Sequence, residues 1–226
     1  MDVGVVAIAF ALFGLVALAL VWSGDWAYAS LAQATGNTRT TFVRAATGRD
    51  PAGEIPMPID ALLDWHRRWA AYVVGWSSEP PNAGPGGPLF TADEYAHMAD
   101  VRAVFRGAEA VALVSLAVVA FRVMRARARD DALGMIRDAS LLSAALVVGI
   151  GLAATFAFDA LFLLFHEMFF PQGNFLFDPA TSNLLRLYPE WYWQGVTAGV
   201  GISFIVVAIL VASGAQVALR RYTRRA

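Results

Sequence analysis

Hydrophobic residues along this chain gather in four long runs separated by polar segments. The runs cover residues 3–22, 104–123, 141–165 and 196–219. A helix needs about 20 mainly apolar residues to cross the hydrocarbon core of a bilayer. Trp22 and Trp26 follow the first run, where an aromatic belt is expected at the membrane surface. The pattern predicts an all-α membrane protein with four transmembrane helices, organised as a single integral membrane domain over residues 1–226.

The long polar segment between the first two runs, residues 23–100, carries helix signals of its own. We expect a short helix after Asp25 that ends in a turn at residues 35–37, where glycine and asparagine follow one another. An amphipathic helix is expected over residues 59–75, because apolar residues recur there every three or four positions. The segment is therefore predicted to be a long loop outside the membrane that contains short helices.

A helix start is marked just before the second run. Thr91 and Glu94 match the capping box, in which a threonine caps the helix and a glutamate three residues later reaches back to it. We expect this helix to continue without a break into the second membrane span. His97 would then lie about two turns into it, close to the membrane surface.

Arginines indicate which side of the membrane each loop occupies. Short arginine-rich flanks stay in the cytoplasm, and the chain has two of them, over residues 122–137 and 220–225. We therefore predict that both termini and the short connection after the second span are cytoplasmic. Residues 23–100 and 166–193 then lie outside the cytoplasm.

Composition narrows the classes of function. The chain is 58% hydrophobic, above the roughly half expected of a soluble domain, so membrane lipid surrounds it. A formal net charge of -1 and the lack of a basic face argue against a nucleic-acid partner. With no cysteine, the chain has neither disulfides nor thiolate chemistry. The chain lacks the pair of interrupted hydrophobic segments that is typical of transporters, which argues against that class.

Two histidines are the main candidates for chemistry. The predicted topology places His97 and His166 on the same outer side, each at the mouth of a helix, although a lone histidine there is usually structural. Histidine takes and returns a proton near neutral pH. Carboxylates stand beside both: Glu94 and Asp100 near the first, Glu167 next to the second. We predict that one histidine is a general base and the other its partner or the acid, and we assign no chemistry to the third.

Other polar residues support this hypothesis. Asp159 lies seven residues before His166, about two helical turns or roughly 10 Å along the axis, and a buried carboxylate there must be neutral or paired. Gln172 and Asn174, in the polar turn 171–174, are candidate donors to a developing oxyanion. An aromatic wall surrounds the turn and is expected to serve as packing and as an apolar groove for lipid: Phe165, Phe169, Phe170, Phe175 and Phe177.

Three motifs together resemble a known family. Residues 90–102 read Phe-x-x-x-Glu-x-x-His-Met-x-Asp-Val-Arg, and residues 165–179 read Phe-His-x-x-Phe-Phe-x-x-Gly-Asn-Phe-x-Phe-Asp-Pro. Residues 187–190 add Leu-Tyr-Pro-Glu. With four spans and a long first outer loop, this pattern is similar to the lipoprotein intramolecular transacylases, which are bacterial integral membrane proteins. The resemblance maps the family's two histidines onto His97 and His166.

The resemblance implies an acyltransferase of the bacterial cytoplasmic membrane whose active site faces away from the cytoplasm. Its partner would be a diacylglyceryl lipoprotein or lipopeptide, whose sn-2 acyl chain moves to the α-amine of the same N-terminal cysteine and leaves a lyso form. Because nucleophile and ester belong to one molecule, positioning supplies much of the rate. We expect neither a cofactor nor a metal. An acyl-imidazole intermediate is a variant of this mechanism.

Two alternatives from other classes remain open at this point. A metal-dependent membrane hydrolase would use His97, His166 and one of the carboxylates Glu94, Asp100 or Glu167 as ligands. A non-catalytic protein would bind a lipid or a partner through the outer loop.

Overall fold

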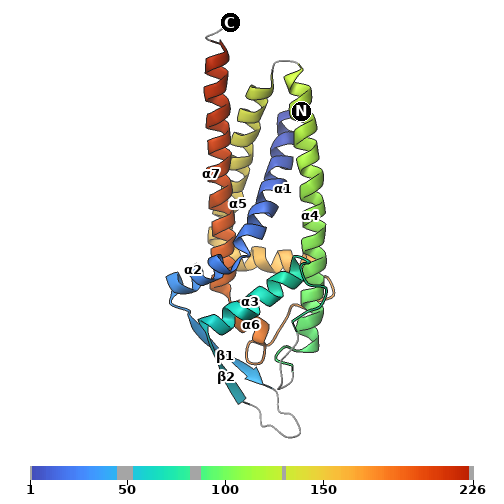
Figure 1. The fold of residues 1–226 in the computed structure, drawn as a ribbon, viewed down its shortest axis with the longest axis vertical. Coiled ribbons are helices and arrows are strands. Elements are labelled where there is room, and N and C mark those ends of the chain that lie inside the picture. The colour runs from blue at the N-terminus through green and yellow to red at the C-terminus, as the bar shows by residue number, and fades with distance from the viewer. Residues whose placement is uncertain (1, 45–52, 82–87, 129–130, 224–226) are drawn as a thin grey trace. The chain divides into compact units, whose positions relative to one another are not determined.

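A computed structural model describes residues 2–44, 53–81, 88–128 and 131–223 (Figure 1). Within these residues, four helices are long and apolar enough to cross a membrane. They are α1 (Asp2–Trp22), α4 (Ala92–Arg127), α5 (Ala132–Phe169) and α7 (Glu190–Thr223). The prediction of an all-α membrane protein with four spans is therefore confirmed. The chain forms two compact units, which are described separately; its behaviour as one domain stays a prediction.

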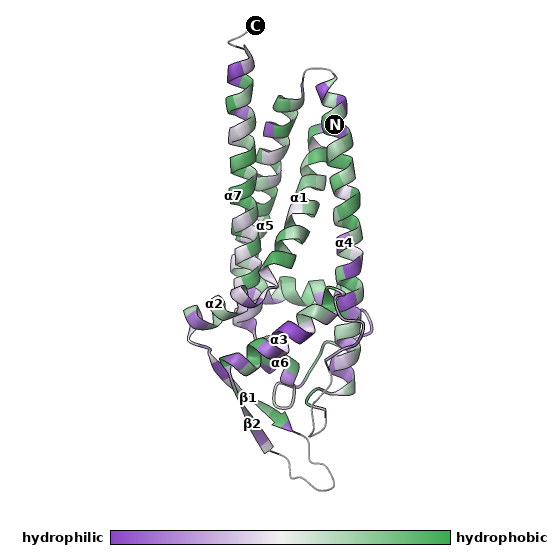
Figure 2. Ribbon diagram, viewed as in Figure 1, coloured by the Kyte–Doolittle hydropathy of each residue, from purple (hydrophilic) through white to green (hydrophobic). Residues whose placement is uncertain are grey.

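The first unit consists of Met1–Val21, Gly107–Phe158 and Thr197–Ala226, in so far as they are described. These stretches of the four long helices are mainly hydrophobic (Figure 2). The 36-residue α4 is about 54 Å long, well beyond the roughly 30 Å hydrocarbon core. α4 is thus longer than a membrane span requires, and the predicted span limits within these helices stay a prediction.

Small residues let the helices of the first unit pack closely. The ring of Phe204 on α7 is fully buried, and it lies 5.5 Å from the ring of Phe10 on α1. Gly14 makes room for it, because a Cβ at this position would come within 2.7 Å of the Phe204 ring. A second cluster joins α1 to the end of α4 and the start of α5: Val6, Ala7, Ala126, Ala132, Met135 and Ala139. In this part of the core, small side chains let the helix backbones approach closely, and large side chains fill less of the space between them.

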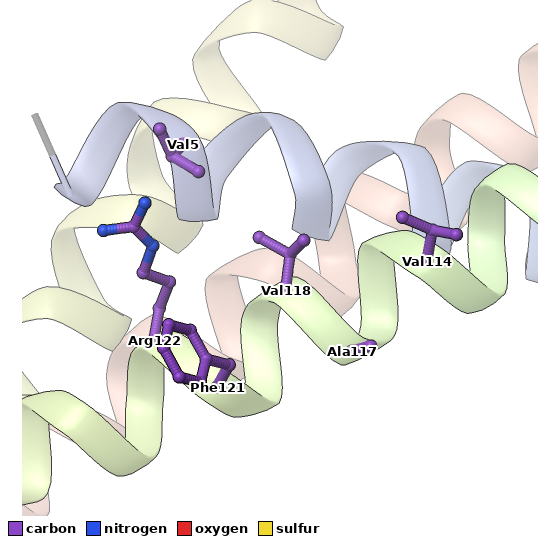
Figure 3. Close-up of a pocket in the computed structure, with 6 residues that line it drawn as sticks. All are labelled: Val5, Val114, Ala117, Val118, Phe121 and Arg122. Atoms are coloured by element: carbon purple, nitrogen blue, oxygen red, sulfur yellow. The ribbon is translucent and has the colours of Figure 1, made fainter.

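A shallow apolar hollow of about 470 Å³ lies beside α1 and α4 in the first unit (Figure 3). Val5 of α1 faces Val114 and Val118 of α4 across it, and Arg122 stands at one end. The Arg122 guanidinium donates to Asp2 at 2.6 Å. The hollow contains none of the predicted site residues.

α5 is kinked at Ala157, whose φ of -141° and ψ of 39° interrupt the helical backbone. The sequence predicted one span over residues 141–165, which contains no proline. The structure instead ends the regular part of the span before Asp159, and the helical piece that follows belongs to the second unit. His166 lies on that piece.

The second unit consists of Trp22–Arg106 and Asp159–Val196. Its described part confirms both helices expected after the first span. α2 (Asp25–Thr35) ends at Gly36, whose φ of 74° is favourable only for glycine, and whose N–H donates to Ala32 and Gln33. α3 (Ile59–Val73) buries one face, including Leu62, Trp65, His66, Trp69, Tyr72 and Val73. The segment after the first span is thus largely ordered structure rather than a loop.

An antiparallel hairpin in this segment was not predicted. β1 (Arg39–Arg44) pairs with β2 (Gly53–Pro58) in the register Arg39 to Pro58 and Phe42 to Ile55. The β-branched run around Phe42 was an available strand signal, but the two prolines of β2 argued against a strand. Residues 45–52, between the two strands, lie outside the described residues.

The hairpin is held by a short helix from the other end of the unit, α6 (Asn183–Leu187). The Asn183 amide oxygen accepts from Val43 N–H at 2.7 Å, and its NH₂ donates to Val43 C=O at 2.8 Å and to Leu89 C=O. Arg186 donates to Thr41 C=O at 3.1 Å. These bonds join β1, α6 and the approach to α4, and so fix the base on which the candidate site stands.

Candidate active site

The site begins with the start of α4, where the predicted capping box is present. Thr91 Oγ1 accepts from Glu94 N–H at 3.2 Å, and Glu94 Oε2 accepts from Thr91 N–H at 2.7 Å. The other carboxylate oxygen of Glu94 accepts from Ser182 Oγ at 2.6 Å and from Leu184 N–H at 2.7 Å. Glu94 is 1% exposed, so this one side chain ties the first turn of α4 to the first turn of α6.

His97 follows one turn later on the same helix and is 6% exposed. Its ring lies against Phe170 and Phe177, with centroid distances of 4.8 and 5.5 Å. The pKa of His97 is lowered to about 4, mainly by burial and also by His166 nearby, whereas Asn174 and Asp100 oppose the shift. Glu94 uses its carboxylate elsewhere, so the expected pairing of Glu94 with His97 is not what the structure contains. At neutral pH His97 is uncharged.

His166 lies on the piece of α5 beyond the kink and is partly buried. Its Nδ1 lies 2.8 Å from the backbone carbonyl oxygen of Phe162. A carbonyl can only accept, so Nδ1 carries the proton and Nε2 has a free lone pair. Burial lowers the pKa of His166, while the bond to Phe162 partly offsets this. His166 is therefore a neutral base with a defined tautomer.

The structure brings the two predicted histidines together within the second unit. Their rings are stacked, with centroids 6.1 Å apart and planes inclined by 19°. Phe170, 2% exposed, contacts both, at 4.8 Å from His97 and 5.4 Å from His166. A proton on one ring disfavours a proton on the other, because like charges repel at this distance in a poorly solvated site.

Asp100 joins the polar turn 171–174 to α4 through hydrogen bonds. Gln172 Nε2 and Asn174 Nδ2 both donate to Asp100 Oδ2, at 2.7 and 2.6 Å. Between them stands Gly173, whose φ of 76° lets the chain reverse tightly. The two amide NH₂ groups predicted to hold an oxyanion are thus donating to a carboxylate. Asp100, Gln172 and Asn174 form one connected group beside His97.

Two other predicted residues are not gathered into this group. Asp159 and Glu167 both have exposed side chains on the part of α5 beyond the kink. Asp159 follows the kink at Ala157 by two residues, so it does not lie on the regular helix that precedes the kink. The expected buried Asp159 is not found among the protein's own side chains.

Aromatic rings enclose the histidine pair on several sides. Of the predicted aromatic wall, Phe165 and Phe175 lie 5.5 and 5.2 Å from His166, while Phe169 packs on Phe165 instead. Sequence reasoning missed Phe162, which is 4.2 Å from His166 and accepts its Nδ1–H. Its position four residues before His166, one helical turn away, was the available signal.

The third histidine, His66, has a structural environment. Its Nε2 donates to Ser23 C=O at 3.1 Å, and its Nδ1 accepts from Tyr188 OH at 3.2 Å. The residue is 1% exposed, and burial lowers its pKa. Tyr28 packs on its ring and donates to Leu187 C=O at 2.8 Å. His66 therefore links α2, α3 and the approach to α7, as its assignment to a non-chemical role requires.

A metal site of the kind considered for a hydrolase is not assembled in the described residues. They contain no group of three or more His, Cys, Asp or Glu side chains arranged to hold a metal ion. What the site offers is a pair of uncharged imidazoles, one with an unprotonated Nε2, in aromatic surroundings. Such a pair can take a proton from a nucleophile and return it to a leaving group.

The fold and the paired histidines define a polytopic membrane enzyme. Residues 71–193, more than half of the chain and including both histidines, match the family described as lipoprotein intramolecular transacylase Lit. The chain belongs to this family. It is an acyltransferase of the lipoprotein-modifying class, and the expected function class is confirmed.

Solved structures agree with this membership at the level of the fold. The membrane integral lipoprotein intramolecular transacylase Lit from Bacillus cereus matches with a TM-score of 0.69 and 15% identity, over 100% of this chain and 97% of that one. A form of that protein with one histidine replaced by arginine matches with a TM-score of 0.65, 14% identity and coverage of 99% and 92%. The corresponding alanine form matches with a TM-score of 0.64 and 15% identity, over 98% of this chain and 93% of that one. No curated protein matches the sequence significantly.

Proposed function

We propose that this protein moves the sn-2 acyl chain of a diacylglyceryl lipoprotein to the α-amine of the same N-terminal cysteine. The product is a lyso-form lipoprotein with an N-acyl chain, one remaining O-acyl chain and a free sn-2 hydroxyl. The observation that carries this proposal is the stacking of His97 and His166, with a free Nε2 on His166. It supplies the base that the attack of an amine on an ester needs.

The chemistry balances without any group from outside the substrate and the two histidines. The uncharged amine attacks the sn-2 ester carbonyl, and Nε2 of His166 takes the proton that the nitrogen loses. The C–O bond to the glycerol then breaks, and the imidazolium returns that proton to the departing sn-2 oxygen. An N–C bond replaces an O–C bond, and His166 ends in its starting state. Amine and ester belong to one molecule, so holding them in the reactive geometry increases the rate of the attack.

We assign the proton transfer to His166 rather than to His97. The pKa of His97 is lowered to about 4, which makes it a weak base. His166 is less buried, and Phe162 holds the proton on its Nδ1. A charge on His166 further disfavours a charge on His97, so at most one of the two rings is charged at a time. His97 then serves as an uncharged neighbour that accepts a hydrogen bond from the attacking amine.

The aromatic surroundings suit a reaction that has to exclude water. Phe162, Phe165, Phe170, Phe175 and Phe177 contact one or both imidazoles. Water in the site would hydrolyse the ester instead of letting the amine capture it. The same rings offer an apolar surface to the acyl chains of the substrate. We propose that both termini are cytoplasmic and that this site faces the outer side of the bacterial cytoplasmic membrane.

Mass spectrometry of a synthetic diacylglyceryl lipopeptide tests the proposal. After incubation with the purified protein, the intact mass should stay constant, while fragmentation should locate one acyl chain on the amine. Replacement of both histidines, His97→Ala with His166→Ala, should abolish the transfer. Asp93→Asn, an exposed carboxylate in the first turn of α4, is the matched control and should transfer normally. An unmoved chain would refute the proposal, and loss of one acyl mass would show a hydrolase instead.

A further inference from the structure

We propose that Asp100 and Asn174 set the tautomer of His97, with Asn174 as the positioning residue and Asp100 as its anchor. The side chain of Asn174 would receive the Nδ1–H of His97 and leave Nε2 of that ring unprotonated. This inference deepens the proposed function, since it defines which atom of His97 faces the substrate. The tautomer itself is a structural property and does not depend on the reaction.

Asp100 determines which way the Asn174 amide points. The carboxylate oxygen Oδ2 can only accept, so the group that lies 2.6 Å from it must be the amide NH₂ of Asn174. The amide carbonyl oxygen, Oδ1, therefore points away from Asp100. Asp100 stands one helical turn after His97 on α4, and Gly173 lets the opposite segment turn back toward it. The anchor and the ring it serves thus share one rigid helix.

Two buried atoms of these side chains are left without partners by this arrangement. Among the described residues, Asn174 Oδ1 and His97 Nδ1 are both buried and neither makes a hydrogen bond of good geometry. The Asn174 side chain nevertheless lies near enough to favour the protonated ring. One atom can only accept and the other can carry a hydrogen. An unsatisfied buried polar atom is costly, so a proton on Nδ1 directed at Oδ1 satisfies both atoms at once.

The consequence is a matched pair of rings. Phe162 C=O holds the proton on Nδ1 of His166, and Asn174 C=O would hold it on Nδ1 of His97. Both stacked imidazoles then offer an unprotonated Nε2. An attacking amine has two N–H groups, and one can be transferred to His166 while the other donates to His97. The opposite tautomer of His97 would direct an N–H at the amine and block its approach.

Gln172 provides a control within the same turn. Its amide also donates to Asp100, at 2.7 Å, but its side chain is exposed. Loss of either amide removes one hydrogen bond between the turn and α4. Only loss of Asn174 removes the acceptor beside His97. A role in merely holding the turn would give Gln172→Ala and Asn174→Ala the same effect.

The test is ¹⁵N NMR of the ring nitrogens in the full-length protein labelled with ¹⁵N-histidine and solubilised in detergent. The three histidines are assigned with His66→Gln, His97→Gln and His166→Gln, because the chain has only these three. In the wild type, His97 should show a protonated Nδ1 and an unprotonated Nε2 at pH 7. Asn174→Ala should shift His97 to the other tautomer or to a mixture, while Gln172→Ala should leave it unchanged.

Kinetics with the lipopeptide provide a second readout. Asn174→Ala should lower kcat by about 10- to 100-fold, as loss of a group that orients a histidine commonly does, with KM little changed. Asn174→Asp should not recover the loss, because its carboxylate would replace the NH₂ that donates to Asp100 and would repel that residue. A wild-type His97 with its proton on Nε2 would overturn the inference without any variant. An unchanged tautomer in Asn174→Ala would also overturn it. The expected tautomer in a protein that transfers no acyl chain would instead count against the proposed function.

Discussion

The imidazole rings of His97 and His166 lie parallel, with centroids 6.1 Å apart and planes inclined by 19°. One ring comes from the early turns of α4 and the other from the end of α5. Phe170 touches both, so neither ring can move without disturbing the other's packing. This relationship makes the pair a single acid-base unit, and the following predictions depend on it.

Substitution of the two histidines should be strongly non-additive. His166→Gln removes the base and should lower kcat by about 10²- to 10⁴-fold. His97→Gln should also lower kcat, and the double variant should be little worse than His166→Gln, because residues that act as a unit lose their effect together. Initial rates with the lipopeptide substrate measure this. Losses that simply multiply would show that the two rings act independently.

The pH dependence of the rate should come from the substrate rather than from the histidines. Burial lowers the pKa of His97 to about 4 and lowers that of His166 from its ordinary value of 6.5, so no break at the ordinary histidine value is expected as the pH falls from 8 to 6. The substrate α-amine, with an ordinary pKa of about 8, protonates over this range and loses its lone pair. kcat/KM should therefore fall about tenfold per pH unit below 8, with no further break near 6.5. A clear inflection at 6.5 would mean that a histidine titrates at its ordinary pKa in the free enzyme.

Glu94 should matter more for folding than for chemistry. Its carboxylate is buried and accepts from Thr91 N–H, Ser182 Oγ and Leu184 N–H. Glu94→Ala leaves three donors without an acceptor, two of them buried, and should destabilise the protein by about 3 kcal/mol. Thermal unfolding in detergent measures this, with Asp93→Ala, an exposed neighbour in the same turn, as control. Equal melting temperatures for the two variants would contradict the assigned role.

The proposed orientation in the membrane can be tested with single cysteines, because the chain contains none. Ser78→Cys, exposed in the second unit, should react in intact cells with a membrane-impermeant maleimide. Arg127→Cys, exposed at the end of α4, should react only after the membrane is opened. The reverse pattern would place the histidine pair on the cytoplasmic side and would exclude the proposed lipoprotein substrate.

The hairpin and the kink show where sequence reasoning reached its limit. β1 is a six-residue strand, and its partner contains Pro56 and Pro58, which argue against a strand when read locally. The pairing is supported from elsewhere, since Asn183 bonds both the N–H and the C=O of Val43. At Ala157 no proline or other breaker signals the kink. At the hairpin, contacts with a distant residue outweigh the local preference.

The sequence by itself determined the structural features that depend on residues only a few positions apart in the chain. The four spans follow from the length of the apolar runs, the start of α4 from Thr91 and Glu94, and the end of α2 from Gly36. Those features arise from hydrogen bonds and burial that repeat every three or four residues.

Only the tertiary structure decided which side chains share the site. It placed Glu94 against α6 and Asp100 against Asn174, although the sequence put both carboxylates equally near His97. It also left Asp159 and Glu167 exposed. Such choices depend on how segments far apart in the chain pack against each other, and a helical spacing cannot encode which of several equivalent carboxylates finds a distant donor.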